Sequence, residues 1–283
     1  GEPFLPENGP EPLARKEFWL DLAAHGRKLR APRDEAWRSF YRRLIGIRRA
    51  HPALWRGTHA GLATDGDADR IGVLDENGVF VTQLQVFALL ALYLLEIRGE
   101  RGAIVKSVTT TDMVYKLGEL YHVPVFETPV GFKYLGPKMM SENALIGGEE
   151  SGGFGYRGHI PERDGILSGL YILDFMVKTG KKPSELIKYL YSKVGPHHYN
   201  RIDFHFSEEK REAVVQRLSR LKPTEIDNTK VIKSDTVDGF RFRLSDGSWL
   251  LIRLSGTEPV LRIYAESESL EHVERLLKAG KEL

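Results

Sequence analysis

Several features are missing from this sequence, and each absence narrows the range of possible functions. There is no cysteine, which excludes disulfide bonds, thiolate metal sites and cysteine nucleophiles but leaves the redox compartment open. The net charge is only +2, so no global field attracts the protein to nucleic acid or to a membrane. No apolar run approaches the about 20 residues that span a bilayer, and the N-terminus lacks a signal-peptide pattern. A cytoplasmic protein with two or three domains is therefore expected.

Strand-like and helix-like segments alternate from about residue 60 to residue 190, which predicts an α/β architecture with a largely parallel sheet. Within it, IGVLD-ENG-VFVT predicts a hairpin, because an Asn-Gly pair favours a tight turn. A helix is expected to start after TTTD, whose side chains suit an N-cap. Towards the C-terminus, the strand candidates FRFRL, WLLIRL and LRIYAE lie between two predicted helices. This order indicates a separate small α+β domain.

Three aspartates, Asp65, Asp67 and Asp69, alternate within the segment TDGDADR. Carboxylates this close repel one another unless a cation lies between them, and a hard divalent ion, Mg²⁺ above all, suits such oxygen ligands. An EF-hand calcium loop is excluded, since Arg70 stands where that loop needs glycine and a hairpin follows instead of a helix. Arg70 indicates instead that an anion such as phosphate approaches the metal. A solvated acidic turn is the simpler alternative.

A second cluster is GGEESGGFGYRGHIPERDGI, in which glycines flank Glu149, Glu150 and Ser151. Glycines let the backbone approach a ligand closely, and carboxylates beside a hydroxyl suit a substrate rich in hydroxyl groups. A flexible acidic surface loop is the competing interpretation. Arg163 and Asp164 precede a predicted helix, where they could be no more than a surface charge and an N-terminal cap.

A third cluster is RLSGTEPVLRI, which combines basic and hydroxyl side chains with a glycine between two predicted strands. Its guanidinium, hydroxyl and backbone N–H groups could converge on one phosphate, with Arg262 as a further donor. An arginine-rich turn without a ligand is equally compatible with this motif alone. Lys133, in TPVGFKYL, could add a point charge to the same cleft, although a lone surface lysine is commoner.

These motifs, in this order, resemble the α-D-phosphohexomutases, the phosphoglucomutase and phosphomannomutase family, over about residues 61–283. The resemblance implies two α/β/α mixed-sheet domains, the first of them incomplete, followed by a small α+β domain. The expected limits are 60–99 for a metal-loop domain, 100–196 for a sugar-binding domain and 197–283 for a phosphate-binding domain. The implied chemistry is the Mg²⁺-dependent interconversion of hexose 1-phosphate and hexose 6-phosphate through a phosphoserine and a 1,6-bisphosphate, with glucose 1,6-bisphosphate as activator.

The same resemblance assigns roles to individual residues. Asp65, Asp67 and Asp69 would bind Mg²⁺, and Arg70 and Lys133 would act on the transferring phosphoryl group and its neighbourhood. Sugar hydroxyls would be bound by Glu149 and Ser151, with Arg163 nearby. The phosphate that does not react would be held by Arg253, Ser255, Gly256, Thr257 and Arg262. The substrate would be a hexose phosphate, with a mild preference for glucose over mannose.

The sequence departs from the family in one respect that bears on catalysis. The family nucleophile lies in a first-domain loop of the type T-A-S-H-N-P, and no Ser-His-Asn occurs in these 283 residues. The expectation is therefore a mutase that lacks its phosphoserine domain and needs a separate chain or a homo-oligomer for turnover. A non-catalytic hexose-phosphate-binding module is the main alternative. A phosphatase is weaker, since no base for an attacking water is evident.

The first 59 residues do not share the family pattern. A lead rich in proline and glycine precedes a predicted helix whose apolar face consists of Trp37, Phe40, Tyr41 and Leu44. The stretch FYRRLIGIRRAHPAL resembles a helix near the end of the catalytic barrel of α-amylase-family glycosidases, which suggests a rearranged or truncated gene product. An ordinary amphipathic helix explains it equally well, and both interpretations stay open.

Overall fold

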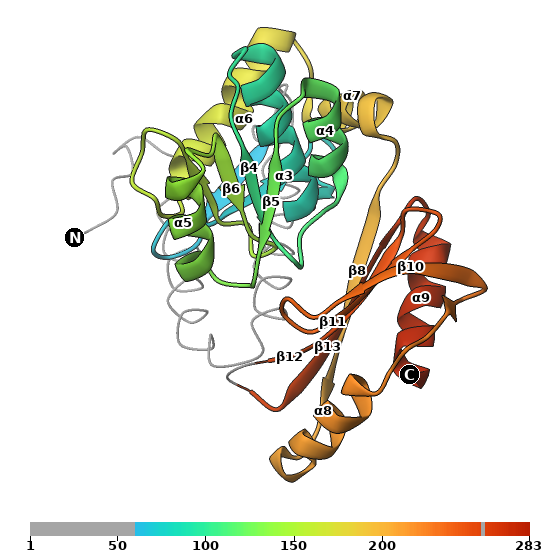
Figure 1. Cartoon of the computed structure of the whole chain (residues 1–283). Helices are drawn as coiled ribbons and strands as arrows, with labels where there is room; N and C mark the ends of the chain where they lie inside the picture. Colours follow the sequence, from blue (N-terminus) through green and yellow to red (C-terminus); the bar gives the residue numbers. More distant parts are fainter. Residues whose placement is uncertain (1–59, 256–257) are drawn as a thin grey trace, which may run out of the picture.

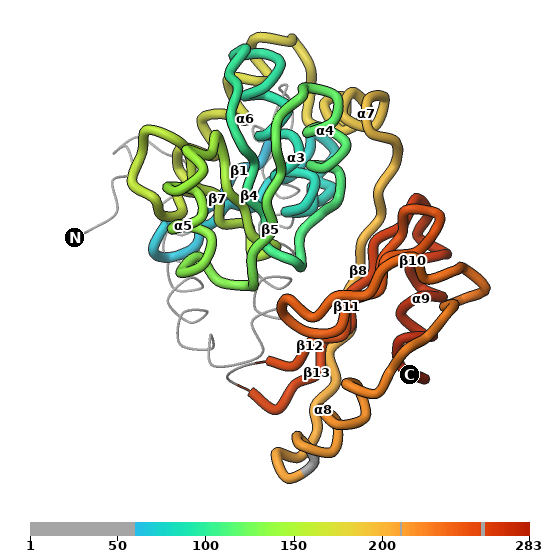
Figure 2. Tube along the Cα trace, in the orientation of Figure 1, coloured from blue at the N-terminus to red at the C-terminus, as the bar shows by residue number. Residues whose placement is uncertain are grey.

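The computed structural model describes residues 60–255 and 258–283. The helix expected within residues 1–59 lies outside these ranges. The described chain forms an N-terminal lobe, residues 60–194, and a C-terminal lobe, residues 198–283, and it passes from one to the other once (Figure 2). No helix in the described part is long and apolar enough to cross a membrane.

The N-terminal lobe begins with a small antiparallel sheet that carries the three aspartates. Its strands follow the order of the sequence: β1 (Gly61–Thr64), β2 (Ile71–Leu74) and β3 (Phe80–Val81). Gly78 adopts a positive φ of 79° in the turn between β2 and β3, where a side chain would be strained. The hairpin predicted from the Asn-Gly pair is therefore confirmed.

A second sheet forms the centre of this lobe. Its strand order is β5 (Val125–Thr128), β4 (Ile104–Ser107), β6 (Ile146–Gly148) and β7 (Phe154–Tyr156). The first three strands are parallel, and β7 pairs antiparallel with β6. The predicted largely parallel sheet is confirmed, and β7 is the exception because it returns directly from the glycine-rich loop after β6.

Helices cover both faces of the central sheet (Figure 1). Helix α5 (Phe132–Ser141) packs with Val105 on one face. On the other face, one core contains α3 (Gln83–Leu92), α4 (Met113–Tyr121), α6 (Gly165–Thr179) and α7 (Pro183–Val194). Helix α3 is apolar on all sides because it lies in the middle of this core. It continues as one π-helical segment, η2 (Tyr93–Ile97).

The expected side-chain cap of α4 is not found. The Asp112 side chain makes no capping hydrogen bond; it accepts instead from Lys106 Nζ at 2.6 Å and from Arg243 Nη1 at 2.6 Å. The Thr111 hydroxyl takes the nearby backbone donor, Met113 N, at 3.0 Å. The sequence pattern identified the start of the helix, but the carboxylate is used in contacts between the lobes.

The C-terminal lobe is a six-stranded antiparallel sheet. The strand order is β8 (His198–His205), β13 (Val260–Ser267), β12 (Trp249–Leu254), β11 (Phe240–Leu244), β10 (Thr229–Asp235) and β9 (Glu225–Ile226). The short helical segment η3 (Glu208–Lys210), α8 (Arg211–Ser219) and α9 (Leu270–Glu282) accompany it. Helix α9 packs against β8 and β13 on one face of this sheet, which we call the inner face. The mixed α/β fold with a small α+β C-terminal domain is thereby confirmed, and β8 to β10 were not predicted.

The outer face of this sheet meets the N-terminal lobe. Trp249, Leu251 and Tyr264 pack there with Val108. Charged side chains flank this apolar patch on both sides. On one side is a buried and half-buried network that we call the interlobe network, made of Lys106, Asp112, Glu127, Asp235, Arg241, Arg243 and Glu266. On the other side lie the arginines of the third sequence motif.

Candidate functional site

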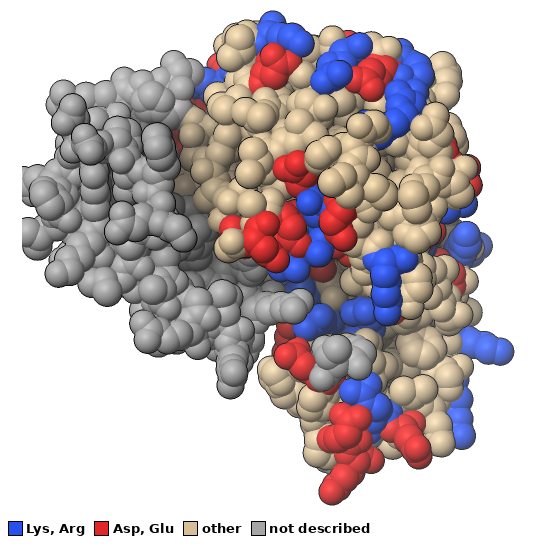
Figure 3. All heavy atoms as spheres, turned by 90° about the vertical axis from the view of Figure 1, so that its left-hand side faces the viewer, with Lys and Arg blue, Asp and Glu red and all other residues tan. Residues whose placement is uncertain are grey.

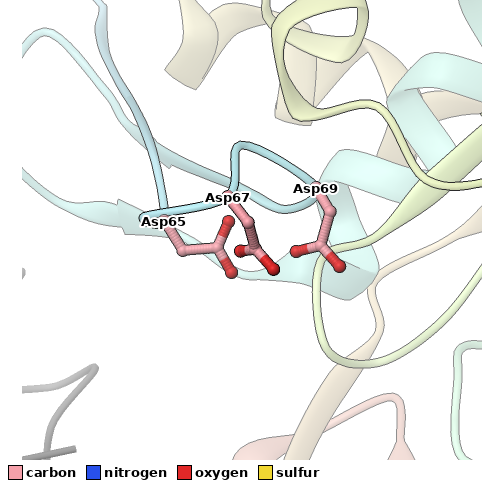
Figure 4. Close-up of side chains that lie close together, drawn as sticks. All are labelled: Asp65, Asp67 and Asp69. Atoms are coloured by element: carbon pink, nitrogen blue, oxygen red, sulfur yellow. The ribbon is translucent and has the colours of Figure 1, made fainter. Parts of the chain in front are cut away.

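The metal loop, residues 65–70, brings its three carboxylates together. Oxygens of Asp65, Asp67 and Asp69 lie within 4.8 Å of one another, and the side chains point to the same side of the loop (Figure 4). The turn is closed by Ala68 N, which donates to Asp65 O at 3.1 Å, and Ala68 adopts a positive φ of 57°. Backbone geometry thus directs alternate side chains to one point.

Electrostatics at this loop favour a cation. Burial and the nearby charge of Asp69 raise the pKa of Asp65 to about 6, as expected where carboxylates repel one another. Asp69 Oδ1 is buried and accepts no hydrogen bond from the described residues. An orphaned oxygen within a group of three carboxylates suits a hard divalent ion. The donor set therefore fits the Mg²⁺ expected from the sequence.

The sugar loop, which we define as residues 147–153, packs against the start of β2, just after the metal loop. Ile71 N donates to Gly152 O at 3.0 Å. Gly152 has a positive φ of 89°, and a Cβ at Gly153 would lie 2.3 Å from Arg163 Cδ. Glycine is required at both positions, one for the backbone conformation and one for the close approach. The GEESGG motif therefore has a local structural reason.

Arg163 joins the metal loop to the sugar loop. Its Nη2 lies 2.7 Å from Asp69 Oδ2, and its Nη1 lies 3.7 Å from Glu149 Oε2. Asp164 caps α6, because its Oδ1 accepts from Leu167 N at 2.8 Å. The capping alternative for Asp164 is confirmed, whereas Arg163 is not an isolated surface charge. Arg70 also lies near the aspartates, with Nε 3.6 Å from Asp69 Oδ1.

Other predicted sugar-site residues differ in their surroundings. Glu149 is buried, and this burial raises its pKa despite the opposing charge of Arg163. Ser151 is exposed on the same loop. Lys133 is exposed at the start of α5, where its ammonium lies 5.0 Å from the Tyr134 ring centroid and forms no ion pair with the described residues. The structure thus brings Glu149 and Arg163 to the aspartates but shows no such contact for Lys133.

The phosphate clamp, which we define as Arg253, Ser255 and Arg262, lies on the C-terminal lobe. Arg253 on β12 is directly opposite Arg262 on β13, and Ser255 is buried just beyond β12. The Nε atoms of both arginines are buried and donate no well-aligned hydrogen bond to the described residues, although Arg253 Nε lies 2.9 Å from Asp238 Oδ1. Buried guanidinium donors with unfilled hydrogen-bonding capacity on neighbouring strands suit a bound oxyanion. Residues 256–257, also predicted here, lie outside the described residues.

Sequence reasoning missed two residues beside this clamp. Arg201 and Asp203 on β8 share an ion pair of 2.9 Å between Nε and Oδ1, and Asp203 is opposite Arg262 in the sheet. Arg201 Nη1 also donates to Glu150 Oε1 at 2.9 Å. Because β8 was not predicted as a strand, nothing in the sequence placed these side chains next to the clamp. Acidic and basic side chains gather where the two lobes meet on the face shown in Figure 3.

Comparison with known proteins identifies the family to which this architecture belongs. Residues 83–194 match the model of the phosphoglucomutase/phosphomannomutase α/β/α domain III, and residues 209–282 match the model of the C-terminal domain of the same family. The chain therefore belongs to the phosphoglucomutase/phosphomannomutase family, as the motifs indicated.

Individual relatives agree with this assignment. A phosphoglucomutase/phosphomannomutase of Thermococcus kodakarensis is 35% identical over 80% of this chain and 47% of its own length. A crystal structure of a Thermus thermophilus protein described as a phosphomannomutase is 37% identical, with a TM-score of 0.66 over 79% of this chain and 45% of that one. The chain spans about half the length of the curated relatives that it matches.

A more distant structure shows the same fold with ligands. N-acetylphosphoglucosamine mutase of Aspergillus fumigatus, solved in complex with GlcNAc-6P and magnesium, is 16% identical with a TM-score of 0.52 over 85% of this chain and 55% of that one. The ligands in that structure belong to that protein, and the likeness to this chain is one of fold. The roles of individual residues in the present chain stay predictions.

Proposed function

We propose that this chain provides the metal, sugar and phosphate sites of an α-D-phosphohexomutase, which interconverts hexose 1-phosphate and hexose 6-phosphate through a 1,6-bisphosphate. The observation that carries the proposal is the link between two predicted sites. Arg163 contacts both Asp69 of the carboxylate trio and Glu149 of the sugar loop. Phosphoryl transfer requires positioning and charge neutralisation above all, and this arrangement is suited to both.

In this proposal Asp65, Asp67 and Asp69 hold Mg²⁺, which when bound neutralises negative charge on the transferring phosphoryl group. Arg70 holds an oxygen of the same phosphoryl group, because its buried Nε has no hydrogen-bond partner among the described residues. Arg163 holds the metal loop and the sugar loop next to each other. Lys133 is proposed as a neighbouring cation that attracts the substrate.

The sugar is bound by Glu149 and Ser151, whose oxygens can accept or donate hydrogen bonds to hydroxyl groups. Arg253 and Arg262 hold the phosphate at the other end of the substrate, with Ser255 and the predicted residues Gly256 and Thr257. Binding the non-reacting phosphate and the hydroxyls orients the reacting group. We propose a hexose phosphate as substrate, with glucose preferred to mannose and glucose 1,6-bisphosphate as activator.

The phosphoryl acceptor is not provided by the family's serine motif, since Ser-His-Asn is absent from these 283 residues. We propose that the phosphoserine comes from polypeptide outside these 283 residues, such as a separate chain, because a second copy of the same residues would lack the motif as well. The same absence favours one alternative, a binding module that holds hexose phosphate without turnover.

A coupled assay separates these functions. The chain is supplied with glucose 1-phosphate, Mg²⁺ and a trace of glucose 1,6-bisphosphate, and glucose 6-phosphate is measured, while calorimetry measures binding of glucose 1-phosphate. Asp67→Ala is compared with Glu119→Ala, which removes an exposed carboxylate on α4. Turnover that only Asp67→Ala abolishes supports the mutase. Mg²⁺-dependent binding with no turnover, even after the separate phosphoserine domain of a family mutase is added, supports the binding module, and no binding to the folded chain contradicts both.

A further inference from the structure

Two of the candidate binding regions lie on different lobes, and an ion pair between Glu150 and Arg201 joins these lobes. The sugar loop belongs to the N-terminal lobe, and the phosphate clamp to the C-terminal lobe. Glu150 of the sugar loop accepts a hydrogen bond from Arg201 Nη1 at 2.9 Å. Both side chains are largely shielded, with exposed fractions of 20% and 16%. A charge-assisted hydrogen bond in such surroundings is among the stronger kinds in proteins.

Arg201 is itself fixed by the sheet of the C-terminal lobe. It lies opposite Tyr264 on β13, and its guanidinium carbon is 5.7 Å from the centroid of that ring. Its Nε lies 2.9 Å from Asp203 Oδ1, two residues along β8. Residues two apart on a strand share one face of a sheet. Arg201 therefore points to the same side as Asp203, towards the clamp.

Asp203 extends the contacts to the clamp. It is opposite Arg262 in the sheet, and its Oδ2 lies 3.6 Å from Arg262 Nε. Glu150, Arg201, Asp203 and Arg262 therefore form a series of side chains of alternating charge, which we call the ion-pair series. The series runs from the sugar loop to the clamp.

Burial makes the pairing of Glu150 important. Burial raises the pKa of Glu150 to about 7, so its ionised form is poorly solvated there. Removing the partner of a buried charge costs more than the pair itself contributes. The position of the carboxylate, and with it that of the neighbouring Glu149, is therefore tied to Arg201.

We propose that Glu150 and Arg201 are a positioning pair that couples the sugar loop to the phosphate clamp. An anion bound by Arg262 restricts the motion of that guanidinium group. The restriction passes through Asp203, Arg201 and Glu150 to the sugar loop, which becomes better ordered. Affinity for the non-reacting phosphate thereby helps to orient the groups that bind the hydroxyls. The inference rests on the proposed function, because it assumes that the clamp binds phosphate and that the sugar loop binds the hexose.

Calorimetry on the whole chain at pH 8, above the pKa of about 7 for Glu150, tests the coupling with two ligands in the presence of Mg²⁺, inorganic phosphate and glucose 1-phosphate. In Glu150→Gln the clamp is unchanged, so inorganic phosphate should bind within about twofold of wild type. Glucose 1-phosphate should bind about tenfold more weakly, the scale of one lost charge-assisted hydrogen bond. Arg201→Gln should behave in the same way. The double variant should lose no more affinity for glucose 1-phosphate than the single variant that binds it more weakly.

Glu258→Gln is the matched control. Glu258 also faces the clamp, with Oε2 3.5 Å from Arg262 Nη2, but it is 59% exposed and belongs to no contact with the sugar loop among the described residues. Both ligands should bind to this variant within about twofold of wild type. A change in glucose 1-phosphate affinity equal to that of Glu150→Gln would show that general loss of negative charge explains the effect, and would overturn the proposal.

The remaining outcomes are also decisive. If Glu150→Gln leaves the ratio of the two affinities unchanged, the coupling is absent. If Arg201→Gln abolishes binding of inorganic phosphate, Arg201 belongs to the clamp itself and the proposed role is wrong. If either variant fails to fold, Arg201→Lys is measured instead, because lysine keeps the positive charge but lacks the several N–H donors of the guanidinium group. Wild-type protein that binds neither ligand would contradict the proposed function, a result distinct from any of these.

Discussion

The interlobe network contains more carboxyl groups than cations, which leads to a prediction about pH. Three basic side chains, Lys106, Arg241 and Arg243, face four carboxyls, Asp112, Glu127, Asp235 and Glu266. Lys106 and Glu266 are almost completely buried. Burial and the charge of Asp112 raise the pKa of Glu266 to about 7. One proton held by Glu266 would balance the network.

The hydrogen bonds around Glu266 are compatible with that proton. Its Oε2 accepts from Asp112 N at 2.8 Å and from Trp249 Nε1 at 2.9 Å, whereas Oε1 is hydrogen-bonded, among the described residues, to the Thr111 hydroxyl alone. A hydroxyl can accept as well as donate. The proton can therefore reside on Oε1 with Thr111 as acceptor. A glutamine reproduces this arrangement, because it has one oxygen acceptor and one N–H donor.

The perturbation is Glu266→Gln, and its effect should depend on pH. In wild type the folded carboxyl keeps its proton to about pH 7, whereas the unfolded one loses it near 4.5. Stability contributed by this group is therefore complete below pH 4.5 and is lost as pH rises through 7. The interval of about 2.5 pH units corresponds to roughly 3 kcal/mol at most. The glutamine side chain does not titrate. The free energy of unfolding of the variant should therefore exceed that of wild type by up to this amount as the pH rises.

Urea unfolding of both proteins at pH 5, 6, 7 and 8 measures the effect. At pH 5 the two free energies of unfolding should agree within about 1 kcal/mol. At pH 8 the variant should be the more stable by about 2–3 kcal/mol. Groups far from Glu266 titrate equally in both proteins, so the difference reports on Glu266 and its neighbour Asp112. A difference that stays constant from pH 5 to pH 8 would show that Glu266 is ionised throughout, and would refute the reasoning from charge balance.

Three further predictions concern a buried charge, the packing of a glycine and backbone geometry. Lys106→Met removes one of the two cations that lie 2.6 Å from Asp112, the other being Arg243. It should cost about 3 kcal/mol in urea unfolding at pH 8, with a smaller loss at pH 5; equal losses would exclude a charge effect. Gly153→Ala places a Cβ 2.3 Å from Arg163 Cδ, which should lower stability by about 1–3 kcal/mol. It should also weaken glucose 1-phosphate binding in calorimetry, and an unchanged affinity would show that this glycine has no role in the binding site. Ala68→Gly relieves a positive φ of 57° and should raise stability by about 0.5–1 kcal/mol, so a lower urea midpoint would contradict strain at this position.

The sequence predicted much of the fold because its signals were local. Alternating apolar segments indicated the central sheet and its helices, and the Asn-Gly pair indicated the β2–β3 hairpin, which the structure confirms. The strand β8 was missed because few of its side chains are apolar. Ile202 and Phe204 pack on the C-terminal core, whereas Arg201 and Asp203 on the other face form ion pairs. The contacts of β8 to β13 are long-range, and no local pattern encodes them.

The candidate site divides in the same way. Three aspartates at alternate positions could be identified from the sequence by itself, because a short loop is enough to bring them within 4.8 Å. Only the tertiary structure places Arg163 between Asp69 and Glu149, and only it joins Glu150 to Arg201 across the two lobes. The physical reason is that residue spacing determines short-range geometry, whereas pairing of distant charges depends on how sheets and lobes pack. The sequence determined the family and the chemical groups, and the tertiary structure decided which of those groups meet.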